Sequence, residues 1–251
     1  MHADVEMCAK LALEGIGSLY ERMVLRDFLA ALVQQEGITS VLEYDCRVTK
    51  GYDNIALLPH AEVAMAVATP QTVERVWPFS ARPRIVDLNA PGSYDLVWSF
   101  AVAQVDPRSV ERMRQASREW VLVFVPNALN WGAPFHWALH RVTRTACRHA
   151  EHRERFRLGT LRGMRHVLAS LGMTVCRSGY IDKPWLPDIG FSKRELRELL
   201  GRGRPREQEP ASPERLAAAV ERLRHFEGWP LPGVLQALVA HHLYVLGRLG
   251  D

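Results

Sequence analysis

The feature that most constrains the fold is an alternation of short apolar runs with helical segments along most of the chain. Runs suited to buried strands occur at Ser40–Glu43, Glu62–Ala68, Arg84–Leu88, Tyr94–Phe100, Trp120–Val125 and Met173–Tyr180. Apolar residues with helical spacing occur at Tyr20–Gln35, Gln71–Trp77, Arg108–Ala116, Phe135–Cys147 and Gly159–Leu171. Strands that alternate with helices form mostly parallel sheets covered on both faces. Residues 20–191 therefore predict an α/β domain.

Both ends of the chain extend beyond this domain. Residues 1–19 form an N-terminal extension, and residues 192–213 form a charged segment and a linker rich in proline and glycine. Residues 214–251 predict a helical C-terminal appendage, whose last helix covers Gly233–Leu249.

That last helix is apolar on more than one face, so we expect it to bury against the domain or against another chain. A protein partner or a second copy of the chain is the expected occupant of such a face. His241 and His242 are interpreted as incidental members of this helix.

Composition indicates a soluble protein of the cytoplasm. The chain has 251 residues, of which 47% are hydrophobic and 24% are charged, as in ordinary globular domains. No basic segment followed by an apolar run opens the chain, and no apolar stretch approaches the roughly 18 residues of a membrane span, so no membrane association is expected. The four cysteines contain no Cys-x-x-Cys pair, which indicates reduced thiols.

Three segments carry a resemblance to a known family. Ser40-Val-Leu-Glu43 ends in an acidic residue, Tyr94-Asp-Leu-Val-Trp-Ser-Phe100 leads to the helix start Asp106–Pro107, and Trp120-Val-Leu-Val-Phe-Val-Pro-Asn127 is a continuous apolar run. In order and spacing they resemble the first, fourth and fifth strands of class I (Rossmann-like) methyltransferases that depend on S-adenosyl-L-methionine (SAM). The resemblance implies a Rossmann-like, mostly parallel sheet flanked by helices, and SAM as cofactor.

The chain departs from that family where the cofactor binds. The family's first strand leads into an acidic-x-Gly-x-Gly-x-Gly turn, but here the glycine places hold Asp45, Arg47 and Thr49. Glycines in such a turn adopt positive φ and let a ligand approach the backbone. In the family, the second strand ends in a carboxylate that accepts hydrogen bonds from the ribose. The corresponding place here is near Ala68, whose side chain has no acceptor. We therefore expect impaired or lost SAM binding.

Two functions follow as alternatives. The first is a methyltransferase-like pseudoenzyme, a structural or regulatory partner in a protein complex. The second is an active small-molecule methyltransferase with an atypical cofactor loop that turns near Gly51. In either case the resemblance places a degenerate cofactor site at Glu43, Asp45, Arg47, Gly51, Asp87 and Phe100.

The segment after the fifth strand often borders the acceptor pocket in this family. The resemblance thus implies substrate-side residues at Asn127, Asn130, Trp131, His136 and His140. His136 and His140 have the four-residue spacing that metal sites use, but no carboxylate pattern accompanies them, so a plain helix face is preferred and no metal is predicted.

A third class of function is a binding module for an anionic ligand. Residues 141–165 are rich in arginine, and Arg47 lies in the altered loop. The region lacks interleaved aromatic residues, which argues against nucleic acid as the ligand.

Overall fold

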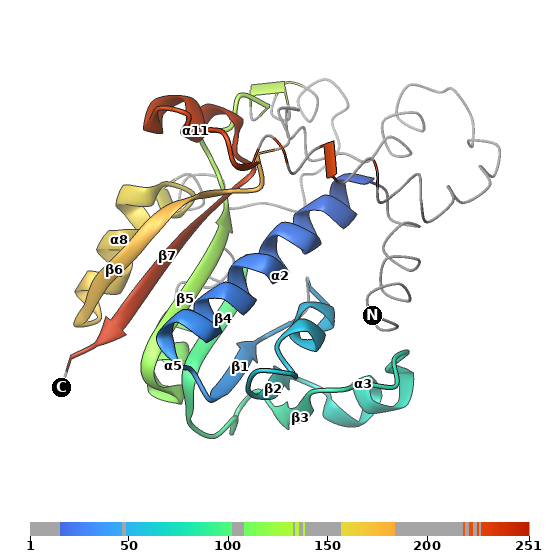
Figure 1. The fold of residues 1–251 in the computed structure, drawn as a ribbon. Helices are drawn as coiled ribbons and strands as arrows, with labels where there is room; N and C mark the ends of the chain where they lie inside the picture. Colours follow the sequence, from blue (N-terminus) through green and yellow to red (C-terminus); the bar gives the residue numbers. More distant parts are fainter. Residues whose placement is uncertain are drawn as a thin grey trace.

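The computed structural model describes residues 16–46, 49–101, 108–132, 157–183 and 227–250, together with a few single positions between 134 and 225. Figure 1 shows one sheet with helices on both faces. The strands are β1 (Ser40–Tyr44), β2 (Glu62–Val67), β3 (Arg84–Asp87), β4 (Tyr94–Phe100), β5 (Ser117–Pro126), β6 (Met173–Ile181) and β7 (His242–Leu249). The helices are α2 (Ile16–Glu36), the 3-10 helix η1 (Tyr52–Ala56), α3 (Pro70–Val76), α5 (Arg108–Ala116), α8 (Leu161–Ser170) and α11 (Gly233–Val239).

The seven strands lie in the order β3-β2-β1-β4-β5-β7-β6. The pairs β1–β2, β1–β4, β2–β3 and β4–β5 are parallel, whereas β7 runs antiparallel to both β5 and β6. The chain order reverses between β1 and β4, and ligands of open α/β sheets bind outside the carboxyl ends of strands at such a point.

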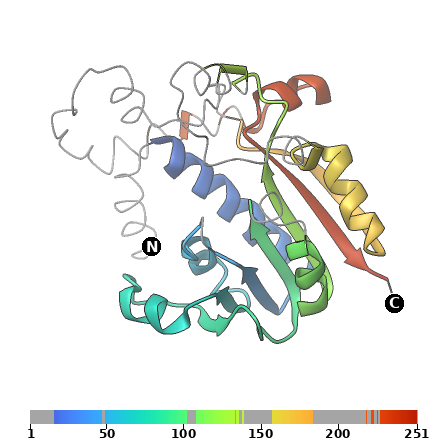
Figure 2. The ribbon, with the colours of Figure 1, turned by 180° about the vertical axis from the view of Figure 1, so that it is seen from behind.

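Two buried cores hold the layers together. On one face, α2 packs Leu25, Leu29 and Leu32 against side chains of the sheet that include Trp98 and Phe124. On the opposite face, seen from behind in Figure 2, α5 covers β4 and β5 while α8 covers β6 and β7, with apolar side chains such as Met113 and Met164. The predicted Rossmann-like sheet flanked by helices is therefore confirmed.

The C-terminal helix predicted over Gly233–Leu249 is wrong beyond residue 239. The chain forms the short helix α11 and then enters the sheet as β7, where Trp120 to Pro126 pair with Arg248 to His242. An apolar run rich in leucine and valine suits a buried strand as well as a helix, and pairing on both sides satisfies the backbone of β7. The C-terminal segment is thus part of the sheet.

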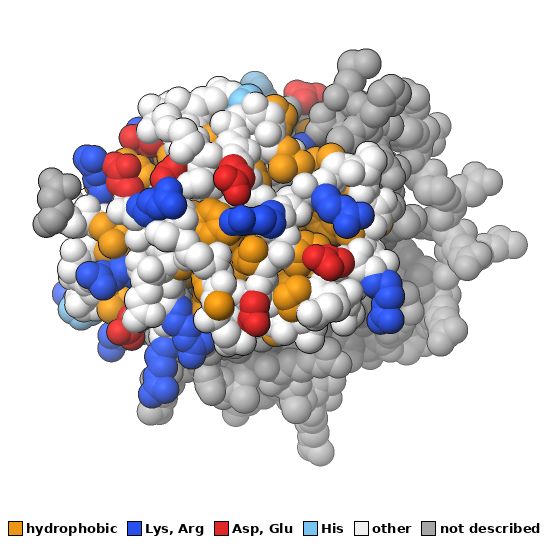
Figure 3. Space-filling view, turned by 90° about the horizontal axis from the view of Figure 1, so that it is seen from below, with side chains coloured by type: hydrophobic (Ala, Val, Ile, Leu, Met, Phe, Trp, Pro, Cys, Tyr) orange, Lys and Arg blue, Asp and Glu red, His pale blue; other side chains and the backbone are white. Residues whose placement is uncertain are grey.

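The amino ends of the parallel strands carry surface ion pairs. Arg84 contacts Glu62 at 3.6 Å and Arg118 contacts Asp95 at 3.4 Å. Figure 3, seen from below, shows basic and acidic side chains interspersed with apolar ones on this side. Within the part of the chain that the structure describes, no helix combines the length and apolar character needed to span a membrane.

Candidate functional site

The end of β1 is tied down by hydrogen bonds from within the chain. Glu43 is fully buried, and its two carboxylate oxygens accept hydrogen bonds from Thr49 Oγ1 and from Asn54 Nδ2, the latter at 2.6 Å. Asn54 in turn accepts a hydrogen bond from the indole nitrogen of Trp98 at 3.2 Å. We call Glu43, Thr49, Asn54 and Trp98 the β1 cluster. Burial raises the pKa of Glu43 to about 8, and the negative charge of Asp53 adds to the rise.

A buried ion pair joins this cluster to α2. Arg22 Nη1 lies 2.9 Å from Asp53 Oδ2, and both side chains are almost inaccessible to solvent. The guanidinium group also lies over the ring of Phe100, 5.1 Å from its centroid. Arg22 therefore fixes η1 and the end of β4 relative to the first turns of α2.

The loop after β1 has three described residues with positive φ, although only one of them is glycine. Asp45 has a φ of 55°, Lys50 a φ of 55° and Gly51 a φ of 75°. Aspartate tolerates this left-handed region better than most residues do. A Cβ on Gly51 would meet the sulfur of Met65, so only glycine fits there without movement. The turn expected at Gly51 is present in the structure.

The ends of β2 and β3 differ in the acceptor groups that they carry. β2 ends at Val67 and Ala68 follows, so no acceptor side chain stands at that place. Asp87, at the end of β3, accepts hydrogen bonds from the backbone and side-chain nitrogens of Asn89 at 2.8 and 3.1 Å.

Aromatic side chains pack beside the Gly51 turn. Tyr52, Trp77 and Phe79 contact one another edge to face, with ring centroids 5.0 to 5.8 Å apart. Trp77 also packs against the buried side chains of Cys46 and Met65. This side of the sheet edge is therefore filled by the protein's own side chains.

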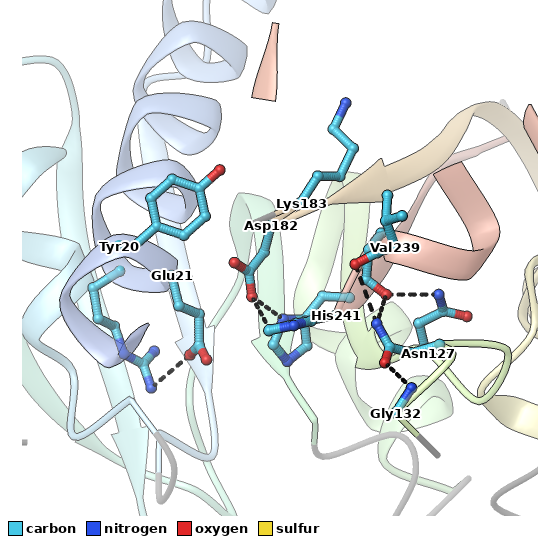
Figure 4. A network of polar contacts seen from close by, with 12 residues as sticks. Tyr20, Glu21, Asn127, Gly132, Asp182, Lys183, Val239 and His241 are labelled. Atoms are coloured by element: carbon cyan, nitrogen blue, oxygen red, sulfur yellow. Dashed lines mark hydrogen bonds and ion pairs between the residues drawn. The ribbon is translucent and has the colours of Figure 1, made fainter. Parts of the chain in front are cut away.

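A second polar cluster lies where β6 ends and β7 begins. Asp182 Oδ2 lies 3.0 Å from His242 Nδ1 and 3.4 Å from His241 Nδ1. Glu21 of α2 faces this pair, and Figure 4 shows it beside Asp182. We call Glu21, Asp182, His241 and His242 the β7 cluster. The ring of His242 lies 4.8 Å from that of Phe100, so the two clusters meet at the end of β4.

The charges of the β7 cluster influence one another. Burial alone would raise the pKa of Asp182, but hydrogen bonds with His241 and His242 outweigh it and the pKa is lowered. Burial alone would lower the pKa of His242, but its hydrogen bond with Asp182 and the charge of Glu21 raise it. Burial raises the pKa of Glu21 in spite of the opposing charges of His242 and Arg22.

Two of the expected substrate-side residues use their amides within the protein. Asn127 Nδ2 donates to the carbonyl oxygens of Ala237 and Ala240 at 2.7 and 2.8 Å. Asn130 Nδ2 donates to those of Val239 and Ala240 at 3.1 and 3.0 Å. Both asparagines are buried and fix the end of α11, and Figure 4 shows Asn127 in this position beside Val239.

The other expected site residues have varied surroundings. Trp131 is partly exposed and stacks edge to face on Phe135. Arg47 and the side chains of His136 and His140 lie outside the described residues, so their predicted roles stay predictions.

Sequence reasoning missed the residues of the β7 cluster. Glu21 sits in the helix α2, and no motif in the sequence marks it. Asp182 and His242 are 60 positions apart, and only the antiparallel pairing of β6 with β7 brings them together. The only sequence signal was the apolar run that begins at His242. This run is compatible with a strand, and a strand there would have placed His242 in the sheet.

Comparisons with known proteins support the fold. No protein-family model matches the sequence, and no curated protein matches it. The structure is similar to magnesium protoporphyrin IX methyltransferase from Synechocystis PCC 6803 with bound SAH, at 12% identity and a TM-score of 0.51 over 70% of this chain and 83% of that one.

Weaker structural likenesses extend over more of the chain. One is to a putative sarcosine dimethylglycine methyltransferase from Galdieria sulphuraria, with 15% identity and a TM-score of 0.49 over 90% of this chain and 86% of that one. Another is to the plantazolicin methyltransferase BpumL in complex with SAH, with 13% identity and a TM-score of 0.48 over 99% of this chain and 96% of that one. Strand order and the Synechocystis likeness together define the class I methyltransferase fold.

Proposed function

We propose that this chain is a methyltransferase-fold protein whose SAM site is closed by its own side chains, and that it acts in the cytoplasm as a structural or regulatory partner in a protein complex. The observation that carries this proposal is the β1 cluster. Both oxygens of the Glu43 carboxyl group bond to Thr49 and Asn54, so the acidic group at the end of β1 is engaged within the chain rather than turned to a ligand.

The neighbouring strand ends support the same conclusion. Ala68 follows β2 where a ribose-binding carboxylate is expected, and Asp87 is already bonded to Asn89. Trp77 and Met65 fill the side of the Gly51 turn. The residues present at these strand ends do not fit SAM. Missing hydrogen bonds to a buried ligand cost on the order of 1–3 kcal/mol each, enough together to abolish micromolar affinity.

The surface at α11 supports a binding role. Val234, Leu235 and Leu238 are 75%, 46% and 42% exposed, respectively. The backbone of Trp131 donates a hydrogen bond to the carbonyl oxygen of Leu238, so a further exposed apolar residue lies next to α11 in the fold. Exposed apolar groups that gather in this way mark interaction surfaces, and a second copy of the chain or another protein is the proposed partner.

One observation favours the alternative, an active small-molecule methyltransferase. Asp45 and Gly51 hold left-handed backbone conformations, so the loop after β1 still turns sharply. The β7 cluster also places ionisable groups near the end of β4, where a methyl acceptor would need a base.

Calorimetric titration of the full chain with SAM and with S-adenosylhomocysteine separates the two functions. We expect no binding heat at millimolar ligand from protein shown to be folded by circular dichroism. Binding at micromolar concentration would overturn the closed site and make the enzyme the better proposal.

Light scattering on a size-exclusion column tests the partner surface in the same preparation. Self-association that Leu235→Glu abolishes would identify a second copy as the partner.

A further inference from the structure

The β7 cluster is built around a carboxylate that is only half paired. Asp182 is 4% exposed at its side chain, and its Oδ2 faces both His241 and His242. Its other oxygen, Oδ1, is buried and has no hydrogen-bond partner among the described residues. A buried acceptor without a partner costs about 1–3 kcal/mol, so its presence calls for a ligand that the residues themselves do not supply.

The backbone holds Asp182 firmly in this place. Its φ is 62°, an unfavourable value for a residue other than glycine. Its N–H donates to Glu227 Oε1 at 3.2 Å, and its carbonyl oxygen accepts from the N–H of His241 at 2.8 Å. The carboxylate is therefore oriented before any ligand binds.

Glu21 and His242 complete a compact set of donor atoms. One oxygen each from Glu21 and Asp182 and one nitrogen from His242 all lie within 4.8 Å of one another. Donor atoms around a tetrahedral zinc ion lie about 3.4 Å apart, because each bond is roughly 2.0–2.2 Å long. Binding therefore requires side-chain rotations that draw the three donor atoms closer together. His241 supplies the nearest additional nitrogen.

The charge of the surroundings favours a dication. Arg22 lies 3.4 Å from Glu21, but it is also held at 2.9 Å by the buried carboxylate of Asp53. Lys183 faces Glu227 at 3.9 Å. Among the described residues the carboxylates of Glu21 and Asp182 then face chiefly His241 and His242, and a dication bound by neutral imidazole would take the place of their protons.

From this geometry we propose that Glu21, Asp182 and His242 bind one divalent transition-metal ion of the zinc type. Mixed imidazole and carboxylate donors favour Zn²⁺ or Co²⁺ over Mg²⁺ and Ca²⁺, which take oxygen donors almost alone. The three ligands come from α2, from the residue after β6 and from the start of β7, so the ion ties α2 to β6 and β7. The proposal does not depend on whether SAM binds.

The test is metal titration of the full chain after treatment with a chelator. We expect Zn²⁺ to bind with one-to-one stoichiometry and to raise the melting temperature, and Co²⁺ to give visible absorption bands of a nitrogen- and oxygen-ligated ion. Asp182→Asn keeps the side-chain shape and tolerates the left-handed φ. This variant and Glu21→Gln should each weaken Zn²⁺ binding by at least about tenfold, since even residues behind a ligand have effects of that size.

The matched control is His60→Gln, which removes an exposed histidine that contacts Gln34, away from the cluster. It should leave the affinity unchanged, which separates the site from adventitious binding by surface histidines. Equal Zn²⁺ affinity of wild type and folded Asp182→Asn would overturn the proposal, as would the absence of stoichiometric binding to the wild type. Mg²⁺ binding in preference to Zn²⁺ would also contradict it.

Discussion

The β1 cluster and the β7 cluster lie at the same edge of one sheet, yet their buried carboxylates are paired to different extents. In the β1 cluster, Glu43 receives a hydrogen bond on each oxygen, and Asn54 is bonded in turn to Trp98. In the β7 cluster, one oxygen of Asp182 faces two histidines and the other has no partner within the described chain. In the β1 cluster both carboxyl oxygens thus have a hydrogen-bond partner, whereas in the β7 cluster one carboxyl oxygen has none among the described residues.

This difference in the hydrogen bonding of the buried carboxyl groups indicates a different role for each cluster. A completed hydrogen-bond network stabilises the fold and leaves nothing for a ligand, while an unpaired buried oxygen is retained at a cost to stability. Asp53 also has one oxygen without a hydrogen bond among the described residues, but its carboxylate is balanced by Arg22 and by the charge of Arg26. We infer that the β1 side has become structural and that the β7 side retains a ligand site.

The largest effect is expected from the ion pair that supports the β1 side. Asp53→Ala leaves the buried guanidinium of Arg22 without its partner at 2.9 Å, and such losses cost about 3–5 kcal/mol. Glu119→Ala is the control, because it removes a surface pair with Arg248 at 2.7 Å that should contribute less than about 1 kcal/mol. Urea denaturation measures both. Equal losses for the two variants would show that the buried pair is not structural.

The pH dependence of stability tests whether Glu43 is a structural group. Its pKa is raised from 4.5 to about 8, so between those values the folded chain holds a proton that the unfolded chain has released. The contribution of Glu43 to stability should therefore be fully present below about pH 4.5 and should be lost as the pH rises towards 8, by up to about 1.4 kcal/mol per pH unit. Glu43→Gln keeps a side chain able to bond Thr49 and Asn54, and it should lose this contribution.

Denaturation at pH 5, 7 and 9 compares the wild type with Glu43→Gln. The stability of the wild type relative to the variant should fall from pH 5 to pH 7, and by a smaller amount from pH 7 to pH 9 because the loss levels off above about pH 8. A constant difference would mean that Glu43 titrates in the folded protein at its ordinary pKa, and the closed site would lose its main support.

Sequence patterns were sufficient for the parallel part of the fold. Runs such as Tyr94–Phe100 are short, apolar and bounded by turns, and the strand has the predicted limits. The run after Gly233 was assigned to a helix because its apolar residues fit the period of a helix as well as that of a strand. Only the pairing with β5 and β6 shows that its second part is a strand. Long-range pairing of this kind leaves no local signal.

The candidate site also has one part that the sequence shows and one part that only the folded structure shows. The altered turn is visible in the sequence, since Asp45 and Thr49 stand at the places of glycines. The reason for the change is not visible there, because Thr49 bonds Glu43 only once the loop is folded. Asp182 and His242 meet through tertiary structure alone. Spacing along the chain predicts residues on one strand or helix, not donors from three elements.

A smaller effect is expected from the tight turn beside Met65. Gly51→Ala places a methyl group against the sulfur of that buried methionine and also imposes a φ of 75° on a residue with a Cβ. Gly172→Ala is the control, because it has a similar φ of 79° but nothing within 4 Å of the added carbon. Both should lose about 1 kcal/mol for the backbone, and Gly51→Ala about 1–3 kcal/mol more for the packing. Equal losses would show that the Met65 side of the turn has room for added atoms.

The smallest effect on stability, and the sharpest test of the closed site, is expected from Asp45→Gly. With a φ of 55° the position suits glycine, and the relief of strain should offset the greater freedom of the unfolded chain to within about 1 kcal/mol. The substitution restores one family glycine while it leaves Glu43 bonded to Thr49 and Asn54. We therefore expect no SAM binding heat from Asp45→Gly. Micromolar binding by this variant would mean that one side chain, rather than the β1 cluster, keeps the cofactor out.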